Sequence, residues 1–381
     1  MNAAPIVVVG RSTAGCAAAR ELRALGHDGD IVMIGADPDG SYSRPPLSKH
    51  VLDSDDGTSA RWDLSDLRIT ELNSAATRLN TDSKIVALAD GTDVEYGTLV
   101  VATGADARRL ARVGQAGELV VRTHDDARVL RSRLDAASSA IIVGAGFLGM
   151  EIASACVRRT IETTVVDVDP PLERVLGSFL AAAIEERLAE NSGSMLRPAG
   201  PVTLSGSPVD GIVLPDRTAL HADVVVSCVG EVPASDWLDG TGVADRDGVG
   251  IGEDCSTSVP DVFAAGDVTY FREPSRYPRR GPFWSNAVAQ GRVAAASALG
   301  AAARCAPVDD YFWTEVLGLS IKAVGPLPLV GEPEIVTGSV DDGSALLRWT
   351  HPDGRKTLVA YGLRMSVGKL RALARAEQGQ G

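Results

Sequence analysis

The chain has 381 residues, of which 45% are hydrophobic and 23% charged, and its formal net charge is −13 at pH 7. This composition excludes a disordered chain, and the length is sufficient for two or three domains. Because so acidic a protein repels polyanions, neither nucleic acid nor an anionic membrane surface is an expected partner.

The cysteines are spaced widely in the sequence, at Cys16, Cys156, Cys228, Cys255 and Cys305. We therefore do not expect a redox-active dithiol between neighbouring cysteines. The odd number of cysteines, and the lack of a basic segment before the apolar run 6–10, favour a cytoplasmic location. No stretch is apolar over the length that a membrane span requires.

The N-terminal segment predicts the opening of a βαβ unit. The apolar run Pro5–Gly10 has the pattern of a buried parallel strand, and the stretch Cys16–Leu25 has that of a helix. The apolar residues Ile31–Ile34 then predict the return strand.

The turn between this strand and helix reads Gly10-Arg-Ser12-Thr-Ala-Gly15. In a dinucleotide-binding turn, three glycines provide a tight bend, a close approach to the pyrophosphate and close helix packing, in that order. Ser12 occupies the second position, where it adds a Cβ but also offers a hydroxyl donor. Asp37 is expected to hold the adenosine ribose. The turn is therefore either an altered FAD-binding turn or a degenerate one that binds nothing.

A second unit of this kind begins at Ala140–Gly144 and continues in a helix at Met150–Arg159. Its turn keeps all three glycines and reads Gly144-Ala-Gly146-Phe147-Leu148-Gly149. Asp167 follows about 20 residues later, as expected of a carboxylate that binds an adenosine ribose. This carboxylate would repel a 2′-phosphate, so we expect NADH rather than NADPH. Arg174 nearby weakens that expectation, since an arginine accommodates the phosphate.

The rest of the chain predicts smaller elements. The Val-, Gly- and Asp-rich segment Ser207–Gly252 is expected to close the second domain. A strand at Val262–Val268 precedes a helix at Asn286–Leu299, and short alternating runs after Pro307 precede a basic helix at Val367–Ala376. We expect a separate α+β domain in this last part.

Several motifs follow one another in the order of a known family. They are Ser41-Tyr-Ser-Arg44-Pro-Pro-Leu-Ser-Lys49, Leu99-Val-Val-Ala-Thr103-Gly104-Ala, Val229-Gly230-x-x-Pro233, Thr257-Ser-x-Pro-Asp-Val-Phe-Ala-Ala-Gly266-Asp267-Val, Trp284-Ser-Asn286-Ala and Tyr311-Phe-Trp313-Thr-Glu. Along nearly the whole chain, this series resembles the FAD- and NADH-dependent ferredoxin and rubredoxin reductases. These are related to glutathione reductase and to apoptosis-inducing factor.

The resemblance implies an α/β fold of the glutathione-reductase type, with two Rossmann-like dinucleotide-binding domains and a C-terminal α+β domain. Residues 1–111 and 233–306 would form the FAD-binding domain, residues 112–232 the NADH-binding domain, and residues 307–381 the C-terminal interface domain. It further implies FAD and NADH as cofactors, a ferredoxin or rubredoxin as electron acceptor, and a monomer or weak homodimer.

The resemblance also implies the site residues. Lys49 would pair with Glu151 close to the flavin, as the catalytic residues, because a buried lysine requires a partner and a cation there tunes the flavin potential. Asp267 would accept hydrogen bonds from the ribityl chain or act as a helix N-cap. The expected cofactor contacts are Gly10, Ser12, Gly15, Asp37, Arg44, Lys49, Thr103, Gly104, Arg108, Gly144, Gly146, Phe147, Leu148, Gly149, Glu151, Asp167, Gly230, Gly266, Asp267 and Trp284. The scattered histidines have no metal-ligand spacing, so no metal is expected.

For each of three features, the sequence allows two interpretations. Phe147 either covers the flavin until nicotinamide displaces it or packs against the protein. Trp284 either flanks the flavin edge or a docking site, or is a core residue. A group of arginines stands at Arg272, Arg276, Arg279 and Arg280. It is either a docking patch for an acidic iron–sulfur protein or part of a solvated loop.

No cysteine lies between Cys16 and Cys156, where disulfide and coenzyme A disulfide reductases of this fold carry their redox cysteines. We therefore expect hydride transfer from NADH to FAD, then single electrons to a ferredoxin or rubredoxin that serves an oxygenase. An NADH oxidase or quinone reductase is one alternative. Another is a redox-dependent interaction protein resembling apoptosis-inducing factor, and a third is a member whose FAD binding is weakened by Ser12.

Overall fold

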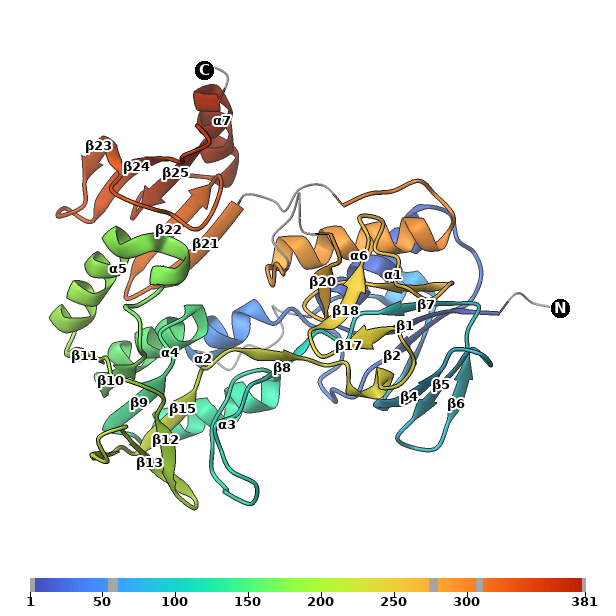
Figure 1. Cartoon of the computed structure of the whole chain (residues 1–381), viewed down its shortest axis with the longest axis horizontal. Helices are drawn as coiled ribbons and strands as arrows, with labels where there is room; N and C mark the ends of the chain where they lie inside the picture. The colour runs from blue at the N-terminus through green and yellow to red at the C-terminus, as the bar shows by residue number, and fades with distance from the viewer. Residues whose placement is uncertain (1–3, 54–60, 274–279, 306–310, 379–381) are drawn as a thin grey trace. The chain divides into compact units, whose positions relative to one another are not determined.

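The computed structural model describes residues 4–53, 61–273, 280–305 and 311–378, and Figure 1 shows its helices and strands. Its internal contacts divide the chain into two compact units, each assembled from three segments. The first unit comprises Met1–Pro46, Asp56–Asp106 and Glu231–Asp309, and the second comprises Leu47–Asp55, Ala107–Gly230 and Asp310–Gly381.

The first unit is built on a five-stranded parallel sheet. Its strands, in the order β19-β7-β1-β2-β3, are Val262–Ala264, Thr98–Val101, Ile6–Val9, Ile31–Ile34 and Ile69–Leu72. Strand β1 has a parallel neighbour on each side, and Val7 and Val8 are completely buried. A strand covered on both faces must be apolar throughout, which explains the uninterrupted run of valines in the sequence.

Two helices of the first unit, α1 (Thr13–Ala24) and α6 (Trp284–Ala298), pack closely against each other. They lie side by side in Figure 1 although they are far apart in the sequence. An added Cβ at Gly291 of α6 would lie 2.3 Å from the carbonyl oxygen of Ala14 in α1. The alanine- and glycine-rich sequences of both helices are therefore required by this close packing.

Smaller elements complete the first unit. A three-stranded antiparallel sheet consists of β4 (Ala76–Asn80), β5 (Ile85–Leu88) and β6 (Asp93–Glu95). The remaining elements are the three-stranded sheet β17 (Ala244–Asp245), β18 (Gly248–Ile251) and β20 (Thr269–Phe271), the strand β16 (Glu231–Pro233), and the short 3-10 helices Ser65–Leu67 and Asp236–Leu238. The 3-10 helix Pro45–Ser48 and the strand β8 (Ala105–Ala107) each contain residues of both units.

The second unit contains a four-stranded parallel sheet in the order β11-β10-β9-β15, formed by Gly193–Leu196, Glu162–Val166, Ser139–Val143 and Val224–Ser227. Its helices are α2 (His50–Asp53), α3 (His124–Leu134), α4 (Phe147–Arg158) and α5 (Glu173–Glu190), and a small antiparallel sheet contains β12 (Thr203–Gly206), β13 (Val209–Val213) and β14 (Ala219–His221). The two predicted parallel sheets are thus present, one in each unit.

The C-terminal part of the second unit is a five-stranded antiparallel sheet with one helix. Its strands, in the order β21-β22-β25-β24-β23, are Tyr311–Val316, Leu319–Val324, Lys356–Tyr361, Ser344–Thr350 and Glu334–Ser339. Helix α7 (Val367–Gln378) packs on β22 and β25 through Leu370 and Ala374. This is the α+β segment that the alternating sequence pattern predicts. The order of its strands could not be predicted from that pattern.

The helices that follow the two glycine-rich turns begin three residues earlier than predicted, at Thr13 instead of Cys16 and at Phe147 instead of Met150. The reason is that the third glycine of each turn is already helical and packs under the first. Among the residues that the structure describes, no helix combines the length and apolar character needed to cross a bilayer. Within the same residues, no three His, Cys, Asp or Glu side chains converge as a metal site would require.

Candidate functional site

The two glycine-rich turns have the same backbone geometry. Gly10 and Gly144 have φ values of +114° and +110°, which only glycine adopts without strain. Their N–H groups donate to the last residue of the neighbouring strand, Ile34 at 2.8 Å and Val166 at 2.7 Å. A Cβ on either glycine would lie 2.0–2.2 Å from a carbonyl oxygen. Each first glycine is therefore obligatory.

The third glycines are equally constrained. A Cβ at Gly15 would lie 1.9 Å from the carbonyl oxygen of Gly10, and one at Gly149 would lie 1.8 Å from that of Gly144. At Gly146, the second glycine of the second turn, an added Cβ would meet no protein atom within 4 Å. The second position thus faces open space in front of the turn, where a pyrophosphate would lie.

The helices that start at these turns expose backbone donors. The N-cap Ser12 of α1 makes no side-chain capping hydrogen bond, and the N-cap Gly146 of α4 has no side chain to make one. By contrast, Thr123 and Asp126 close a complete capping box on α3. The first-turn N–H groups of α1 and α4 therefore remain available to an anion, and the helix dipoles favour one there.

Ser12 is accommodated because its side chain is turned toward the protein. Its backbone is extended, with a φ of −105°, and its hydroxyl donates to the carbonyl oxygen of Tyr42 at 3.0 Å. This hydrogen bond joins the altered turn to the segment Ser41–Pro46, the first part of the Arg-Pro-Pro motif. The hydroxyl that the sequence left as a potential phosphate donor is thus engaged by the backbone.

The two candidate ribose carboxylates are held differently. Asp167 accepts a hydrogen bond of 2.7 Å from the N–H of Ala145, inside its own glycine-rich turn. Asp37 instead accepts from the hydroxyl of Tyr42 and, at 3.0 Å, from the N–H of Asp39. Both carboxylates follow the second strand of their sheet, as predicted, and both are oriented by donors of the same unit.

Arg11 is a residue of the first turn that the sequence analysis did not single out. Its side chain is 4% exposed and pairs with Glu71 at 2.9 Å. The same guanidinium donates to Asn73 at 2.6 Å and to the carbonyl oxygens of Gly35 and Asp37 at 3.1 and 3.0 Å. Arg11 thus fixes the segment that carries the candidate ribose carboxylate. A charged residue inside a glycine-rich turn was the available sequence signal.

The predicted pairing of Lys49 with Glu151 is confirmed within the second unit. The Lys49 ammonium lies 2.7 Å from Oε1 of Glu151, whose side chain is 8% exposed. The carboxylate also accepts from the hydroxyl of Ser48 at 2.5 Å and from that of Thr314 at 3.3 Å. The ammonium lies 4.8 Å from the ring centre of Trp313, within cation–π distance. Ser48, Thr314 and Trp313 come from two of the family motifs, yet no local pattern predicted a role for them at this carboxylate.

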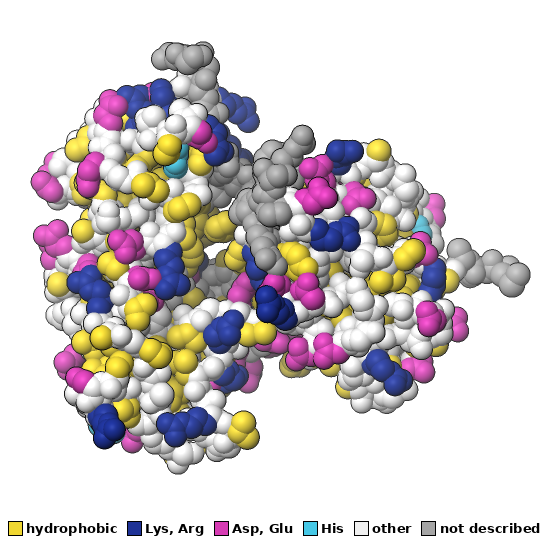
Figure 2. Space-filling model, in the orientation of Figure 1, with side chains coloured by type: hydrophobic (Ala, Val, Ile, Leu, Met, Phe, Trp, Pro, Cys, Tyr) yellow, Lys and Arg dark blue, Asp and Glu magenta, His cyan; other side chains and the backbone are white. Residues whose placement is uncertain are grey.

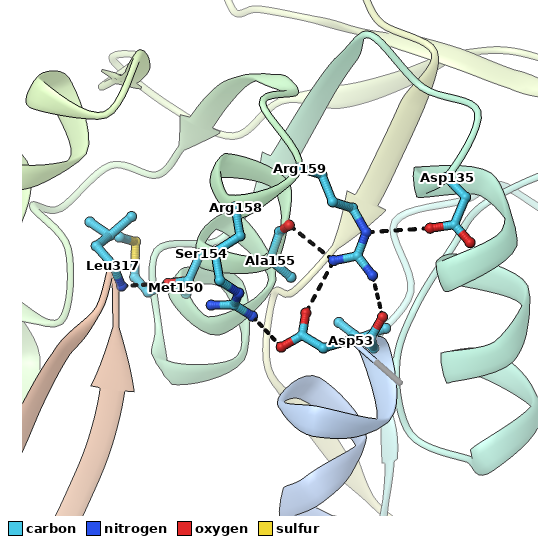
Figure 3. Close-up of polar contacts among 9 residues, drawn as sticks. Asp53, Asp135, Met150, Ser154, Ala155, Arg158, Arg159 and Leu317 are labelled. Atoms are coloured by element: carbon cyan, nitrogen blue, oxygen red, sulfur yellow. Dashed lines mark hydrogen bonds and ion pairs between the residues drawn. The ribbon is translucent and has the colours of Figure 1, made fainter. Parts of the chain in front are cut away.

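Contacts of its C-terminal half hold helix α4, which carries Glu151, in place (Figure 3). Arg158 and Arg159 both pair with Asp53, at 2.8 and 3.2 Å, and Arg159 also reaches Asp135 at 3.4 Å. On the opposite side, the hydroxyl of Ser154 accepts from the N–H of Leu317 at 2.8 Å. Helix α4 is thereby bonded to the segment after Lys49 and to the turn after β21, which bring Lys49 and Thr314 to one carboxylate.

The motif that contains Gly266 and Asp267 has a buried polar support. Gly266 has a φ of +83°, and its N–H donates to the side-chain oxygen of Gln290 at 2.7 Å. Gln290 is 2% exposed and accepts from the hydroxyl of Thr269 at 3.0 Å. The carbonyl oxygen of Asp267 accepts from Arg280 at 2.6 Å. Gln290 is a second residue that the sequence analysis missed, because nothing local marks a buried glutamine on an alanine-rich helix.

Thr103 and Gly104 are brought to the segment after β16 in the first unit. The hydroxyl of Thr103 donates to the carbonyl oxygen of Ala234 at 2.7 Å, and the N–H of Ala234 donates to Gly104 at 3.0 Å. In the second unit, the N–H of Arg108 donates to the carbonyl oxygen of Gly230 at 3.0 Å. Thr103 and Gly104 are thus bonded to Ala234, the residue that follows the Gly230–Pro233 motif.

The aromatic residues have defined surroundings. Phe147 packs on Phe312 of β21, with ring centres 4.6 Å apart, so the packing interpretation accounts for its position. Trp284, 48% exposed at the start of α6, donates its indole N–H to the hydroxyl of Ser43 at 3.1 Å. Trp284 is therefore not a core residue. Arg44 lies over the ring of Tyr42, 5.6 Å from its centre.

Of the four arginines in the predicted group, the structure describes Arg272 and Arg280. Arg280 is engaged internally, pairing with Glu231 at 3.2 Å and donating to the carbonyl oxygens of Asp247 and Asp267. Arg272 is exposed and donates to the carbonyl oxygen of Ser256 at 3.2 Å, while Arg276 and Arg279 lie outside the described residues. On the face drawn in Figure 2, basic and acidic side chains are interspersed on each unit.

Comparison with known proteins agrees with this geometry. Residues 4–291 match the family model described as pyridine nucleotide-disulphide oxidoreductase. Rhodocoxin reductase of Rhodococcus erythropolis is 32% identical over 351 residues, covering 89% of this chain and 82% of that protein. The ferredoxin–NAD(+) reductase component of the anthranilate 1,2-dioxygenase system of Burkholderia cepacia is 32% identical over 99% of this chain and 95% of its own length.

A solved structure shares the fold over most of both chains. The ferredoxin reductase for the CYP199A2 system from Rhodopseudomonas palustris superimposes with a TM-score of 0.85 and 28% identity, covering 94% of this chain and 91% of that one. The protein described here therefore belongs to the pyridine nucleotide-disulphide oxidoreductase family. The predicted fold class is confirmed, and FAD and NADH are the cofactors of this oxidoreductase.

Proposed function

We propose that this protein is a reductase that delivers electrons from NADH to a ferredoxin or rubredoxin serving an oxygenase. FAD supplies the chemistry that links the two-electron donor to a one-electron acceptor, because it accepts a hydride and releases electrons singly. The names of the relatives, which are reductases of ferredoxins in oxygenase systems, support this acceptor class.

The observation that carries the proposal is the buried Glu151 carboxylate with Lys49 as its cation, in a chain that has two dinucleotide-binding turns. No cysteine lies between Cys16 and Cys156, and burial raises the pKa of both of these thiols to about 12. Neither is therefore a thiolate at neutral pH, so the dithiol chemistry of the disulfide reductases has no nucleophile in this region. Electrons must then leave from the flavin directly.

We assign the cofactors to the turns by their residues. Gly10, Ser12 and Gly15 would hold the FAD pyrophosphate, with Asp37 on its ribose, and Gly144, Gly146 and Gly149 would hold that of NADH. The other predicted contacts keep their assignments, namely Arg44, Lys49, Thr103, Gly104, Arg108, Phe147, Leu148, Glu151, Asp167, Gly230, Gly266, Asp267 and Trp284. The division into an FAD-binding domain (1–111 and 233–306), an NADH-binding domain (112–232) and an interface domain (307–381) is part of the same proposal.

NADH is favoured over NADPH by three charged residues after β10. Arg174, the cation that could receive a 2′-phosphate, is bonded through its Nε to Asp169 at 2.6 Å. The hydrogen bond from Arg174 to Asp169, then the charge of Asp169 and least of all the charge of Asp167, raise the pKa of Arg174. Two carboxylates therefore surround one neutralised cation, which disfavours a phosphate dianion. The five cysteines, all of them among the described residues, form no disulfide, which suits a reducing cytoplasm, the location that we propose.

The first test is spectroscopic. The purified protein should show the absorbance of bound flavin, or gain it with added FAD, and this absorbance should bleach when NADH is added without oxygen. The reduced protein is then offered a [2Fe–2S] ferredoxin, a rubredoxin, a quinone or oxygen in separate stopped-flow experiments. Ferredoxin or rubredoxin reduction faster than the other two supports the proposal. Faster quinone or oxygen reduction would instead identify an enzyme without a protein carrier.

The docking of the carrier is tested with matched charge reversals. We expect Arg272→Glu to slow ferredoxin reduction while the rate with ferricyanide, a small acceptor that needs no docking surface, stays unchanged. Arg246→Glu reverses another exposed arginine of the same unit and serves as the control. Equal effects of the two reversals would assign the loss to net charge and remove Arg272 from the docking surface. NADH-dependent partner binding with negligible turnover would favour the interaction protein instead.

A further inference from the structure

Two cysteines that are 50 positions apart in sequence meet in the interior of the first unit. The Sγ atoms of Cys255 and Cys305 are 3.4 Å apart, within the distance of a weak S–H···S hydrogen bond. Cys255 is completely buried and Cys305 is 5% exposed. Neither residue belongs to the glycine-rich turns, the Lys49–Glu151 pair or any family motif that the proposed function uses.

Hydrogen bonds on either side of the pair hold the two sulfurs together. The N–H of Cys305 donates to the carbonyl oxygen of Glu253 at 2.6 Å, and Arg304 pairs with the Glu253 carboxylate at 3.2 Å. The N–H of Cys255 donates to Gly252 at 3.0 Å, closing a turn in which Cys255 has a φ of +61°. The segment after α6 is thus bonded to the turn after β18 at the position of the cysteines.

We propose that Cys255 and Cys305 form an intramolecular disulfide when the protein meets hydrogen peroxide, and that this bond is a reversible oxidation site separate from the flavin chemistry. A disulfide has an S–S distance of about 2.05 Å, so the sulfurs, 3.4 Å apart, need to approach by about 1.35 Å. Rotation of two side chains supplies a movement of that size without displacing the hydrogen-bonded backbone.

The reaction balances in two steps. The Cys305 sulfur attacks one oxygen of the peroxide, the O–O bond breaks, and the products are a Cys305 sulfenic acid and water. The Cys255 thiol then attacks the Cys305 sulfur, the S–O bond breaks, and the disulfide forms with release of a second water. Peroxide is reduced by two electrons and the two thiols are oxidised by the same two. A thiol reductant reverses the modification by exchange.

The surroundings determine which sulfur attacks first. The hydrogen bond from Cys255 lowers the pKa of the Cys305 thiol, whereas burial and then Cys305 raise the pKa of Cys255. Cys305, the more exposed of the two, is thus the more reactive, and Cys255 is the resolving thiol. Cys16 and Cys156 are buried with a pKa of about 12, which makes them poor nucleophiles.

The disulfide would also lie beside the residue that holds Gly266. The Sγ atom of Cys255 is 3.5 Å from the backbone carbonyl oxygen of Gln290, and the side-chain oxygen of Gln290 accepts from the N–H of Gly266. The closed loop would contain β19, β20 and α6, the last elements of the first unit. Because a crosslink restricts the unfolded chain more than the folded one, the oxidised protein should melt at a higher temperature.

The experiment counts thiols in the full-length protein. The reduced protein is treated with a small excess of hydrogen peroxide, denatured in N-ethylmaleimide and analysed by intact mass. We expect wild type to pass from five alkylated cysteines to three, to recover five after dithiothreitol, and to yield one crosslinked Cys255–Cys305 peptide. The oxidised form should have the higher melting temperature. Cys16→Ser is the matched control, since it should still lose two thiols.

Each of Cys255→Ala and Cys305→Ala should abolish the paired loss and the rise in melting temperature. Their own melting temperatures under reducing conditions report whether they fold, and the crosslinked peptide from wild type needs neither variant. Five alkylated cysteines after treatment, oxidation of Cys305 to a sulfinic acid without a crosslink, or a crosslink between different cysteines would each overturn the proposal.

Discussion

The Ser12 hydroxyl donates a hydrogen bond of 3.0 Å to the carbonyl oxygen of Tyr42, so the serine that interrupts the first glycine-rich turn also fastens it. Tyr42 in turn donates its own hydroxyl to Asp37. One short relay therefore joins the turn, the Arg-Pro-Pro motif and the candidate ribose carboxylate. This relay explains how the turn retains its geometry with a residue other than glycine in the middle.

We expect Ser12→Ala to raise the dissociation constant of FAD by about 2- to 10-fold, because a hydrogen bond of this kind is worth about 0.5–1.5 kcal/mol. Titration of the apoprotein, followed by flavin fluorescence, measures the constant. Ser12→Gly also removes the Cβ and should bind FAD at least as well as Ser12→Ala. An Ala variant that binds like wild type would show that the hydroxyl has no role in holding the turn.

Removal of Asp169 should relax the choice of nicotinamide. We expect Asp169→Ala to raise kcat/KM for NADPH by about 2- to 5-fold, since freeing an exposed arginine from its partner is worth about 1 kcal/mol or less. Steady-state rates with ferricyanide as acceptor give the constants for both nucleotides. In an Arg174→Ala background the same substitution should bring no gain, and a gain of equal size there would exclude Arg174 as the phosphate contact.

The ion pair at Glu151 should contribute to the stability of the second unit. Lys49→Met leaves a nearly buried carboxylate with two hydroxyl donors only, and we expect a loss of about 1.5 kcal/mol in the free energy of unfolding. The double variant Lys49→Met/Glu151→Gln should be more stable than the single one, because the buried charge is gone. Urea denaturation of wild type, Lys49→Met, Glu151→Gln and the double variant completes a double-mutant cycle, which gives the coupling energy between the two residues. A double variant with simply additive losses would show that the two residues are not coupled.

The docking of helix α7 should depend on pH. Glu377 accepts from Lys356 at 3.0 Å and from Arg348 at 2.7 Å, and these hydrogen bonds lower its pKa, with Lys356 the larger influence. Because its pKa is lower in the folded protein, Glu377 stabilises the fold fully above its ordinary pKa of 4.5. This contribution is lost as the pH falls below that value.

The Glu377→Gln variant tests the pH-dependent contribution of Glu377 to stability. At pH 7 it should melt below wild type, and the difference should shrink as the pH is lowered from 5 toward 3. Melting followed by circular dichroism across this range gives the two curves. A difference that stays constant down to pH 3 would mean that the Glu377 carboxylate does not titrate in this range or does not stabilise the helix.

Much of the frame was predictable from local patterns. The uninterrupted apolar runs identified β1 and β9 because strands buried on both faces must be apolar at every position. The glycines at 10, 15, 144 and 149 were predictable for the same kind of reason, since a Cβ added at any of them would lie within 2.2 Å of a carbonyl oxygen. The Lys49–Glu151 pair was predictable only through the resemblance, because nothing local links residues on different segments.

The sequence by itself thus determined the two dinucleotide-binding units, their glycine-rich turns and the carboxylates that follow them. Tertiary structure alone decided that Ser12 bonds to Tyr42, that Arg11 is buried against Glu71, that Arg280 is engaged internally, and that Cys255 meets Cys305. The physical reason is the range of the interactions. Strand and turn patterns follow from the conformational limits of adjacent residues, whereas these side-chain contacts join residues from 30 to 60 positions apart that only the packed fold brings together.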